Sequence, residues 1–199
     1  SWLDIGCGEG YYTQQIAEAL PTADGYALDI SREAVKQACR RNKQINWLVA
    51  SMARIPLADA SCDLLASVFS PLDWSEALRL LTPGGGLLRM GPTREHLYEL
   101  REQLYDEVRD YDDEKHLGLI PASMQLTHSE TLRFQLQLNS AEARTDLLAS
   151  TAEGRECATT PTSPGCPATQ SSACWTPTAP TPTRPSSTSA WAFTRTPRA

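Results

Sequence analysis

The run Leu3-Asp4-Ile5-Gly6-Cys7-Gly8-Glu9-Gly10 decides the fold of this chain. It starts inside an apolar strand, Trp2–Ile5, and leads into residues 11–20, whose apolar spacing predicts a helix ended by Pro21. Glycines at alternate positions let the backbone turn tightly and approach a ligand closely. The free N–H groups at the start of the helix suit an anionic part of that ligand. The run therefore predicts a strand–loop–helix unit that binds a nucleotide-like molecule.

The same alternation of strand and helix continues through the first 150 residues. Further strands are expected at 25–30, 46–50, 63–69, 86–90 and 124–138, and helices after Ser31 and at 73–81, 93–111 and 141–149. The segment 82–85, Thr-Pro-Gly-Gly, predicts a turn before the fifth strand. Strands that alternate with helices of about ten residues indicate βαβ units. We therefore expect an α/β fold with a doubly wound, mostly parallel sheet.

The composition changes abruptly at about Ser150. The residues after it hold eight of the chain's 14 prolines among Thr, Ser and Ala, without a period of 2 or 3.6. Such a stretch buries too little apolar area to offset the entropy of ordering, so we expect a disordered tail over 150–199. An out-of-frame translation is favoured over a natural linker, because the break falls inside a helix without a capping signal. The folded domain is expected over 1–149, truncated before Ser1 and without its last strand.

Charge and apolar content exclude several classes of protein. The net charge is −6, and residues 1–150 hold 22 acidic against 14 basic side chains, which argues against unaided binding of nucleic acid. No apolar run approaches the roughly 20 residues that cross a bilayer. No signal peptide is visible, so a cytoplasmic protein without a membrane partner is expected. None of the six cysteines forms a CxxC pair, and we expect no metal in this chain.

The spacing of the glycine run narrows the choice of ligand. A nicotinamide enzyme would show GxGxxG here, but Tyr11 stands where that pattern needs its third glycine. The observed pattern is GxGxG preceded by Asp4. Asp29 ends the second strand, 25 residues after Asp4. A carboxylate in that place can accept hydrogen bonds from both ribose hydroxyls of a nucleoside ligand.

Five features in this order resemble the class I S-adenosylmethionine-dependent methyltransferases: the glycine loop, Asp29, the segment after the third strand, the segment 63–71 and the Pro-Gly-Gly turn. The resemblance implies S-adenosylmethionine as cofactor and a Rossmann-like fold. It also implies contacts of the cofactor with the glycine loop, including Asp4 and Gly6, and of its adenine with Ser51 and Met52. For the last two, the alternative is that they are ordinary loop and packing residues.

A closer resemblance covers residues 1–149. LDIGCGEGYYT, VAS after the third strand and TPGGGLLRMGPTREHLYELR are similar to the bacterial large-subunit ribosomal RNA guanine-N1 methyltransferases of the RlmA type. The resemblance implies ribosomal RNA as partner and cofactor contacts by Gly8 and Glu9. It further implies that His96 reaches the methionine carboxylate of the cofactor. The family's N-terminal zinc module, which would grip the RNA, is absent from this sequence.

The catalytic residues stay unassigned. Guanine N1 carries a proton at neutral pH, so a base must accept it. The corner Phe69-Ser70-Pro71 after the fourth strand is where the target base would sit, and Asp73 nearby is better suited to capping a helix than to acting as that base. Two alternatives remain: a methyltransferase for a small molecule, such as a quinone precursor, and an inactive fragment that keeps only a cofactor-binding core. In such a fragment, strand 124–138 would lack a neighbour.

Overall fold

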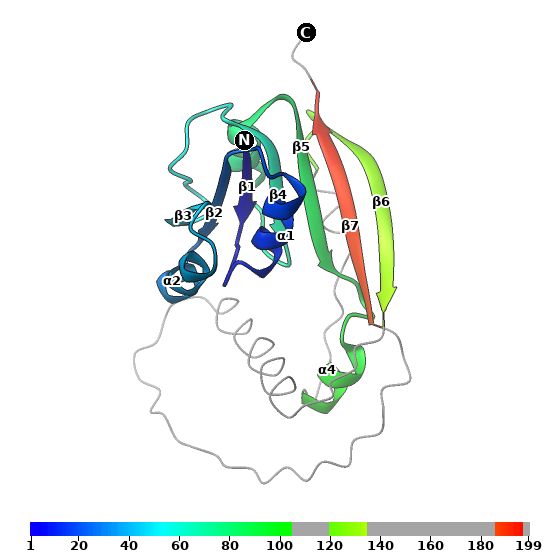
Figure 1. The fold of residues 1–199 in the computed structure, drawn as a ribbon. Coiled ribbons are helices and arrows are strands. Elements are labelled where there is room, and N and C mark those ends of the chain that lie inside the picture. Colours follow the sequence, from blue (N-terminus) through cyan, green and yellow to red (C-terminus); the bar gives the residue numbers. More distant parts are fainter. Residues whose placement is uncertain (105–119, 135–185, 197–199) are drawn as a thin grey trace, which may run out of the picture. The chain divides into compact units, whose positions relative to one another are not determined.

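A computed structural model describes residues 1–104, 120–134 and 186–196 of the chain (Figure 1). Seven strands form one sheet in the order β3-β2-β1-β4-β5-β7-β6. The strands are β1 (Trp2–Ile5), β2 (Gly25–Asp29), β3 (Asn46–Val49), β4 (Cys62–Val68), β5 (Leu81–Pro92), β6 (Met124–Phe134) and β7 (Ser186–Arg195). The pairs among β1 to β5 are all parallel, and β7 runs antiparallel to both β5 and β6. The expected doubly wound, mostly parallel sheet is confirmed.

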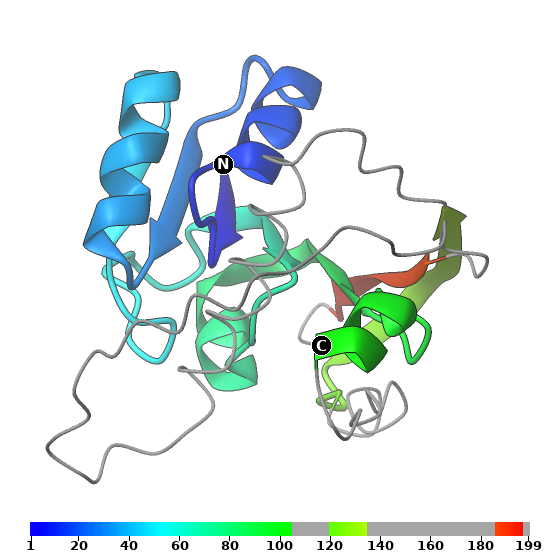
Figure 2. The ribbon, with the colours of Figure 1, turned by 90° about the horizontal axis from the view of Figure 1, so that it is seen from below.

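The described helices are α1 (Tyr11–Ala19), α2 (Arg32–Arg41), α3 (Trp74–Leu80) and α4 (Tyr98–Leu104). As predicted, Ser31 caps α2: its hydroxyl oxygen accepts from the Ala34 N–H at 3.3 Å. Figure 2 shows α1 and α2 on one face of the sheet and α3 on the other. None of the helices in the described part of the chain is long and apolar enough to cross a membrane.

The central strand β1 is buried on both faces, as a strand between two helical layers must be. Leu3 and Ile5 point into the larger core, which α3 covers with Ala77 and Leu80. Trp2 belongs to a second cluster, which residues of α1 cover. The alternation of side chains along a strand thus sends successive residues of β1 to different helices. The carboxyl ends of the parallel strands β1, β2, β4 and β5 meet at one edge, where the candidate site lies.

The expectation that residues 150–199 are disordered throughout and lack a last strand is wrong for residues 186–195. These residues form β7, which separates β5 from β6 and gives the latter its neighbour. Trp191 and Phe193 lie two positions apart on β7 and are only 5% and 2% exposed. The Phe193 ring contacts the Trp74 ring edge-on, with centroids 5.7 Å apart. Two large aromatic residues at a spacing of two are a strand signal that the surrounding Ser and Thr concealed. The rest of the expected tail, 150–185, lies outside the described residues.

Two element boundaries also differ from expectation. β5 begins at Leu81, and the Thr-Pro-Gly-Gly segment is an irregularity within it: partners change from Cys62↔Leu81 to Leu64↔Gly86. The helix expected from Thr93 begins only at Tyr98, because Leu97 has a φ of 47°, which no α-helix accommodates. The segments 105–111, 135–138 and 141–149 of the expected elements lie outside the described residues.

Candidate cofactor and acceptor site

The glycine loop joins β1 to α1 in a conformation that depends on its glycines. Gly6, Gly8 and Gly10 have φ values of 76°, 52° and 82°, in the left-handed region that side chains disfavour. A Cβ on Gly6 would lie 2.4 Å from the Cβ of Ser70, and one on Gly10 would lie 2.7 Å from the ring of Trp47. A Cβ on Gly8 would meet nothing within 4 Å. Two glycines therefore allow close packing, while Gly8 borders open space that a cofactor can occupy.

Asp29 stands at the carboxyl end of β2, beside that space. Its Oδ2 accepts from the Gly8 N–H and its Oδ1 from the Ser31 N–H, both at 2.8 Å. Each carboxylate oxygen can accept a further hydrogen bond. The two observed bonds therefore orient the carboxylate and leave acceptor positions for a ligand. Ile30 is 72% exposed immediately beyond it. An apolar side chain in that place suits a flat adenine ring, and the apolar residue directly after Asp29 is the signal that would have indicated it.

Asp4 lies behind the loop. It is 1% exposed, and the Thr13 hydroxyl in α1 donates to its Oδ2 at 2.6 Å. Burial raises the pKa of Asp4 from 3.8 to about 6; the Thr13 hydrogen bond opposes that rise and the charge of Asp29 adds to it. Asp4 therefore ties β1 to α1 beneath the loop. Thr13 was not predicted from the sequence as a residue of the site. Only its place in the first turn of the helix could have indicated that role.

The cysteine inside the loop is not a reactive group. Burial raises the pKa of the Cys7 thiol to about 12, so it stays protonated at neutral pH. Among the residues that the structure describes, no three His, Cys, Asp or Glu side chains gather to hold a metal.

The other expected cofactor residues occupy more open positions. Glu9 pairs with Arg41 of α2 at 3.0 Å on the surface. The Ala50 N–H donates to the Asp29 carbonyl at 3.1 Å, which brings the following residues, Ser51 and Met52, close to Asp29. Ser51 is exposed, whereas Met52 is half-buried and packs against the larger core. The structure therefore gathers the glycine loop, Asp29 and the segment after β3 at one edge.

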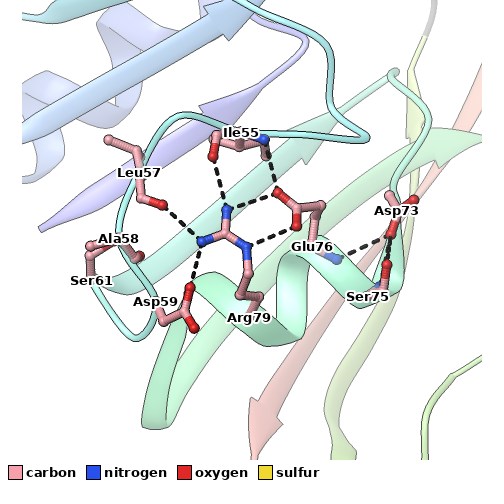
Figure 3. Close-up of polar contacts among 9 residues, drawn as sticks. All are labelled: Ile55, Leu57, Ala58, Asp59, Ser61, Asp73, Ser75, Glu76 and Arg79. Carbon is pink, nitrogen blue, oxygen red and sulfur yellow. Dashed lines mark hydrogen bonds and ion pairs between the residues drawn. The ribbon is translucent and has the colours of Figure 1, made fainter.

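Arg79 of α3 anchors the loop that follows Ser51 and Met52 (Figure 3). Its guanidinium donates to the carbonyls of Ile55 and Leu57 and to Asp59 and Glu76, at 2.8 to 2.9 Å. Glu76 completes the network by accepting from the Ile55 N–H at 2.8 Å, and the Arg79 hydrogen bonds lower its pKa to about 2. This network was not predicted from the sequence, because two of the four partners of Arg79 are backbone carbonyls, which no residue type marks.

The corner after β4 is fastened to the end of β1. The Ser70 hydroxyl donates to the Ile5 carbonyl at 2.5 Å, and the Ser67 hydroxyl donates to the Ser70 carbonyl at 3.1 Å. Asp73, slightly further on, caps α3 and accepts from the N–H groups of residues 75 and 76, which confirms the capping interpretation. A hydrogen bond from the Ser75 hydroxyl, together with these backbone bonds, lowers the pKa of Asp73, so it is poorly suited to accept a proton at neutral pH.

Aromatic rings from three segments meet next to this corner. The ring centroids of Tyr12 and Phe69 are 6.1 Å apart, and those of Phe69 and His96 are 5.2 Å apart. Tyr11 contacts Tyr12 edge-on at 5.1 Å. His96, which the sequence placed in a helix, lies in the turn before α4. The sequence indicated Phe69 and His96 separately, and the adjacent aromatics at 11 and 12 were the signal that it missed.

Comparisons with known proteins agree with this geometry. Residues 3–85 match the family model described as a methyltransferase domain. The chain is 32% identical over 139 residues to the 23S rRNA (guanine(748)-N(1))-methyltransferase of Streptomyces fradiae, which covers 69% of this chain and 50% of that protein. It is 33% identical over 109 residues to the malonyl-[acyl-carrier protein] O-methyltransferase of Hahella chejuensis, covering 50% of this chain and 39% of the relative.

Among solved structures, a SAM-dependent methyltransferase from Aquifex aeolicus superposes with a TM-score of 0.53 at 17% identity, over 96% of this chain and 80% of that one, which supports the fold. The chain spans about half the length of the curated ribosomal RNA methyltransferases it matches. Sheet order, glycine-loop geometry and these relatives together identify the described core as a class I methyltransferase domain whose cofactor is S-adenosylmethionine.

Proposed function

We propose that the chain transfers a methyl group from S-adenosylmethionine to N1 of a guanine in large-subunit ribosomal RNA. The observation that carries the proposal is the alignment with the Streptomyces protein, whose name specifies this reaction. That alignment covers 139 residues and extends well beyond residues 3–85, which match the family model. The resemblance over residues 1–149 noted in the sequence, with its segment around His96, supports the same acceptor.

The described residues offer a consistent set of contacts for the cofactor. Asp29 would accept the ribose hydroxyls, and Ile30 with Met52 would border the adenine. The open side of Gly8 would admit the ligand, and His96 would reach its methionine carboxylate.

The remaining residues would complete and support the site. Ser51 would bond an adenine edge. Asp4 and Gly6 would shape the loop from behind, and Glu9 would border it at the surface. When bound, the cofactor supplies a methyl group that its positive sulfur already activates.

The chain's own contribution to the reaction is alignment. The acceptor nitrogen must lie in line with the methyl group, and holding that geometry accounts for much of the acceleration. The hydrogen bond from Ser70 to the Ile5 carbonyl holds the acceptor corner against the end of β1. The cofactor would supply the methyl group to N1, and the proton that N1 gives up would pass to solvent, because Asp73 is poorly suited to accept it.

Binding of the RNA itself is assigned to a part of the protein outside this chain. The first 150 residues carry more acidic than basic side chains, which disfavours contact with a polyanion. We propose that a zinc-binding module, as the family resemblance implies, grips the RNA and presents a loop base to the site described above. The chain alone is then expected to bind RNA weakly while it binds the cofactor normally.

The first experiment tests the cofactor site. Asp29→Ala removes the acceptor of both ribose hydroxyls, and calorimetry should show S-adenosylmethionine affinity lowered by roughly 10- to 100-fold, as expected for charge-assisted hydrogen bonds. Asp24→Ala is the matched control, because Asp24 is an exposed aspartate just before β2 whose side chain takes no part in the site. Equal affinity in the Asp29 variant and the parent chain would contradict the ribose assignment.

The second experiment tests the acceptor. The chain is incubated with labelled S-adenosylmethionine and either a malonyl thioester or unmodified 23S ribosomal RNA, the RNA at a concentration high enough to compensate for its weak binding to this chain. A methyl group on N1 blocks the pairing edge of guanine, so reverse transcription should stop at the modified base. Label in the thioester and not in the RNA would replace the proposal by carboxyl methylation, the reaction named for the Hahella relative. Label in neither acceptor would favour an inactive cofactor-binding core.

A further inference from the structure

We propose that Tyr12, Phe69 and His96 form one stacking surface, the aromatic row, which selects a flat aromatic ring as methyl acceptor. In this row Tyr12 is a specificity-determining residue. The inference rests on the proposed function for the same site. It adds a physical basis for choosing between acceptor classes, which the cofactor-binding residues cannot supply.

The row is an open surface and not part of the core. Tyr12 is 40% exposed and Phe69 is 39% exposed, although both are large rings next to buried strands. Their centroids, with that of His96, follow one another at 6.1 and 5.2 Å, which lies within the range of aromatic contacts. The three side chains come from the start of α1, the end of β4 and the turn before α4. The fold therefore brings three rings together at the edge where the glycine loop opens, with interplanar angles of 42° and 33° between neighbours.

The backbone holds the central ring in a costly conformation. Phe69 has a φ of 53°, which a bulky residue rarely adopts because it is sterically unfavourable. The Phe69 N–H donates to the Met90 carbonyl at 2.9 Å, and the neighbouring Ser70 is fixed to Ile5. Strain of this kind persists where the surroundings enforce it, and such residues concentrate at functional sites. The position of the Phe69 ring is therefore set by the fold.

The row is also fixed relative to the cofactor loop. Gly6 lies so close to Ser70 that a Cβ on the glycine would approach the Ser70 Cβ to 2.4 Å. Phe69 directly precedes Ser70, so its ring keeps a constant offset from the loop. Methyl transfer requires this relation, because the acceptor atom must meet the methyl group in line.

Ring faces distinguish the two acceptor classes that the relatives' names suggest. Stacking of a base on an aromatic side chain strengthens binding roughly 5- to 150-fold, whichever base it is. A malonyl thioester has no ring to stack and would gain nothing from the row. The aromatic row therefore favours a nucleobase over a carboxylate.

The test measures binding of small probes to the chain saturated with S-adenosylhomocysteine. Guanosine monophosphate is the planar probe, ribose 5-phosphate is the same probe without a base, and a malonyl N-acetylcysteamine thioester represents the carboxylate class. Dissociation constants come from NMR titration, and the cofactor affinity of each variant is measured in parallel. Phe69→Leu and Tyr12→Leu remove ring faces while keeping an apolar side chain. Tyr11→Leu is the matched control, because Tyr11 is 65% exposed and lies outside the row.

We expect Phe69→Leu to weaken binding of guanosine monophosphate roughly 10-fold or more, and Tyr12→Leu by roughly 3- to 10-fold, in line with the loss of one stacking face. Tyr11→Leu should change it less than about 2-fold, since an exposed ring beyond the row offers no stacking face to the probe. Cofactor affinity should be equal in all four proteins, which also shows that the variants fold.

Several results would overturn the inference. The first is equal binding of guanosine monophosphate by the parent and both row variants. The second is no preference of the parent for guanosine monophosphate over ribose 5-phosphate. The third is tighter binding of the malonyl thioester than of guanosine monophosphate. The guanine-N1 proposal fails independently: RNA that stays unmethylated, while binding of the planar probe depends on Phe69, would leave the row in place and remove only the RNA assignment. Methylated RNA with unaffected row variants would do the reverse.

Discussion

The cofactor edge and the acceptor edge of this domain are built from different material. At the cofactor edge, backbone geometry dominates: three glycines with positive φ shape the loop, and a backbone N–H from Gly8 orients Asp29. At the acceptor edge, side chains dominate: the Tyr12 and Phe69 rings lie 6.1 Å apart, and the His96 ring, which is also proposed to reach the cofactor, adjoins Phe69. In our proposal, the first edge can serve any acceptor, whereas the second distinguishes among acceptors. Variants that act on only one edge can test this division.

The largest effect is expected from Gly6→Ala. The left-handed φ costs about 1–2 kcal/mol for a side chain and the overlap with Ser70 adds about 1–3 kcal/mol, so the free energy of unfolding should fall by roughly 2–5 kcal/mol and cofactor binding should be lost. Gly8→Ala is the control with the same sign of φ and no neighbouring atom, and it should cost only about 1–2 kcal/mol. Chemical denaturation measures both variants. Equal losses of unfolding free energy in the two variants would show that the contact between Gly6 and Ser70 does not contribute to stability.

The next effect concerns Asp4, where a buried charge lowers stability. Its pKa in the folded chain is about 6, against an ordinary value of 3.8, so between about pH 4 and pH 6 the folded state keeps a proton that the unfolded state has lost. The free energy of unfolding therefore falls as the pH rises through this interval, by at most on the order of 3 kcal/mol, and is constant above it.

Asp4→Asn should abolish this fall and make the chain more stable than the parent at pH 7. Cofactor affinity should nevertheless decrease, because the positive sulfonium loses a nearby negative charge. Denaturation curves at pH 4, 5, 6 and 7 decide the point. A variant that keeps the pH dependence of the parent would show that another group causes it.

Arg79→Ala should have an intermediate effect that reaches the cofactor edge from α3. It removes the donors to the Ile55 and Leu57 carbonyls, and a loss of about 1–3 kcal/mol is expected from hydrogen bonds to a charged group. Arg79→Lys keeps the charge but cannot reproduce the fork of donors, so it should recover less than half of the loss. Proteolysis near the anchored loop would provide an independent readout. Full recovery by lysine would mean that charge alone anchors the loop.

The smallest effect is expected from Glu9→Gln. The pair with Arg41 is about half exposed on both sides, so its removal should change the free energy of unfolding by less than about 1 kcal/mol, and less still at high salt. If Glu9 borders the cofactor as proposed, affinity for S-adenosylmethionine should decrease measurably although stability does not. Unchanged affinity would restrict the cofactor edge to the backbone of the loop and Asp29.

The same division explains what could be read from the sequence. Glycines at fixed spacing and an aspartate at a strand end are local signals, and Gly6, Gly8 and Asp29 were predicted as site residues from them. The Thr13–Asp4 bond spans nine residues and the Arg79 network reaches residues up to 24 positions away, and neither follows a local sequence pattern. β7 was missed because Trp191 and Phe193 are surrounded by Ser and Thr, and their strand forms only where β5 and β6 provide partners on both sides. The helix start was misplaced because Leu97 adopts a positive φ that composition does not reveal.

The position of β7 in the sheet also constrains the order of events during folding. The five parallel strands follow one another in the chain, so that part can assemble as the polypeptide emerges. β6 cannot join it until β7 is synthesised, and the Thr188 hydroxyl reaches the Gly91 carbonyl across 97 residues of sequence. Pairing over such a separation is slow, because a long loop must close before any contact compensates for it. We therefore expect the cofactor edge to become structured first and the outer strands last, leaving the edge of β5 open for association with other chains during that interval.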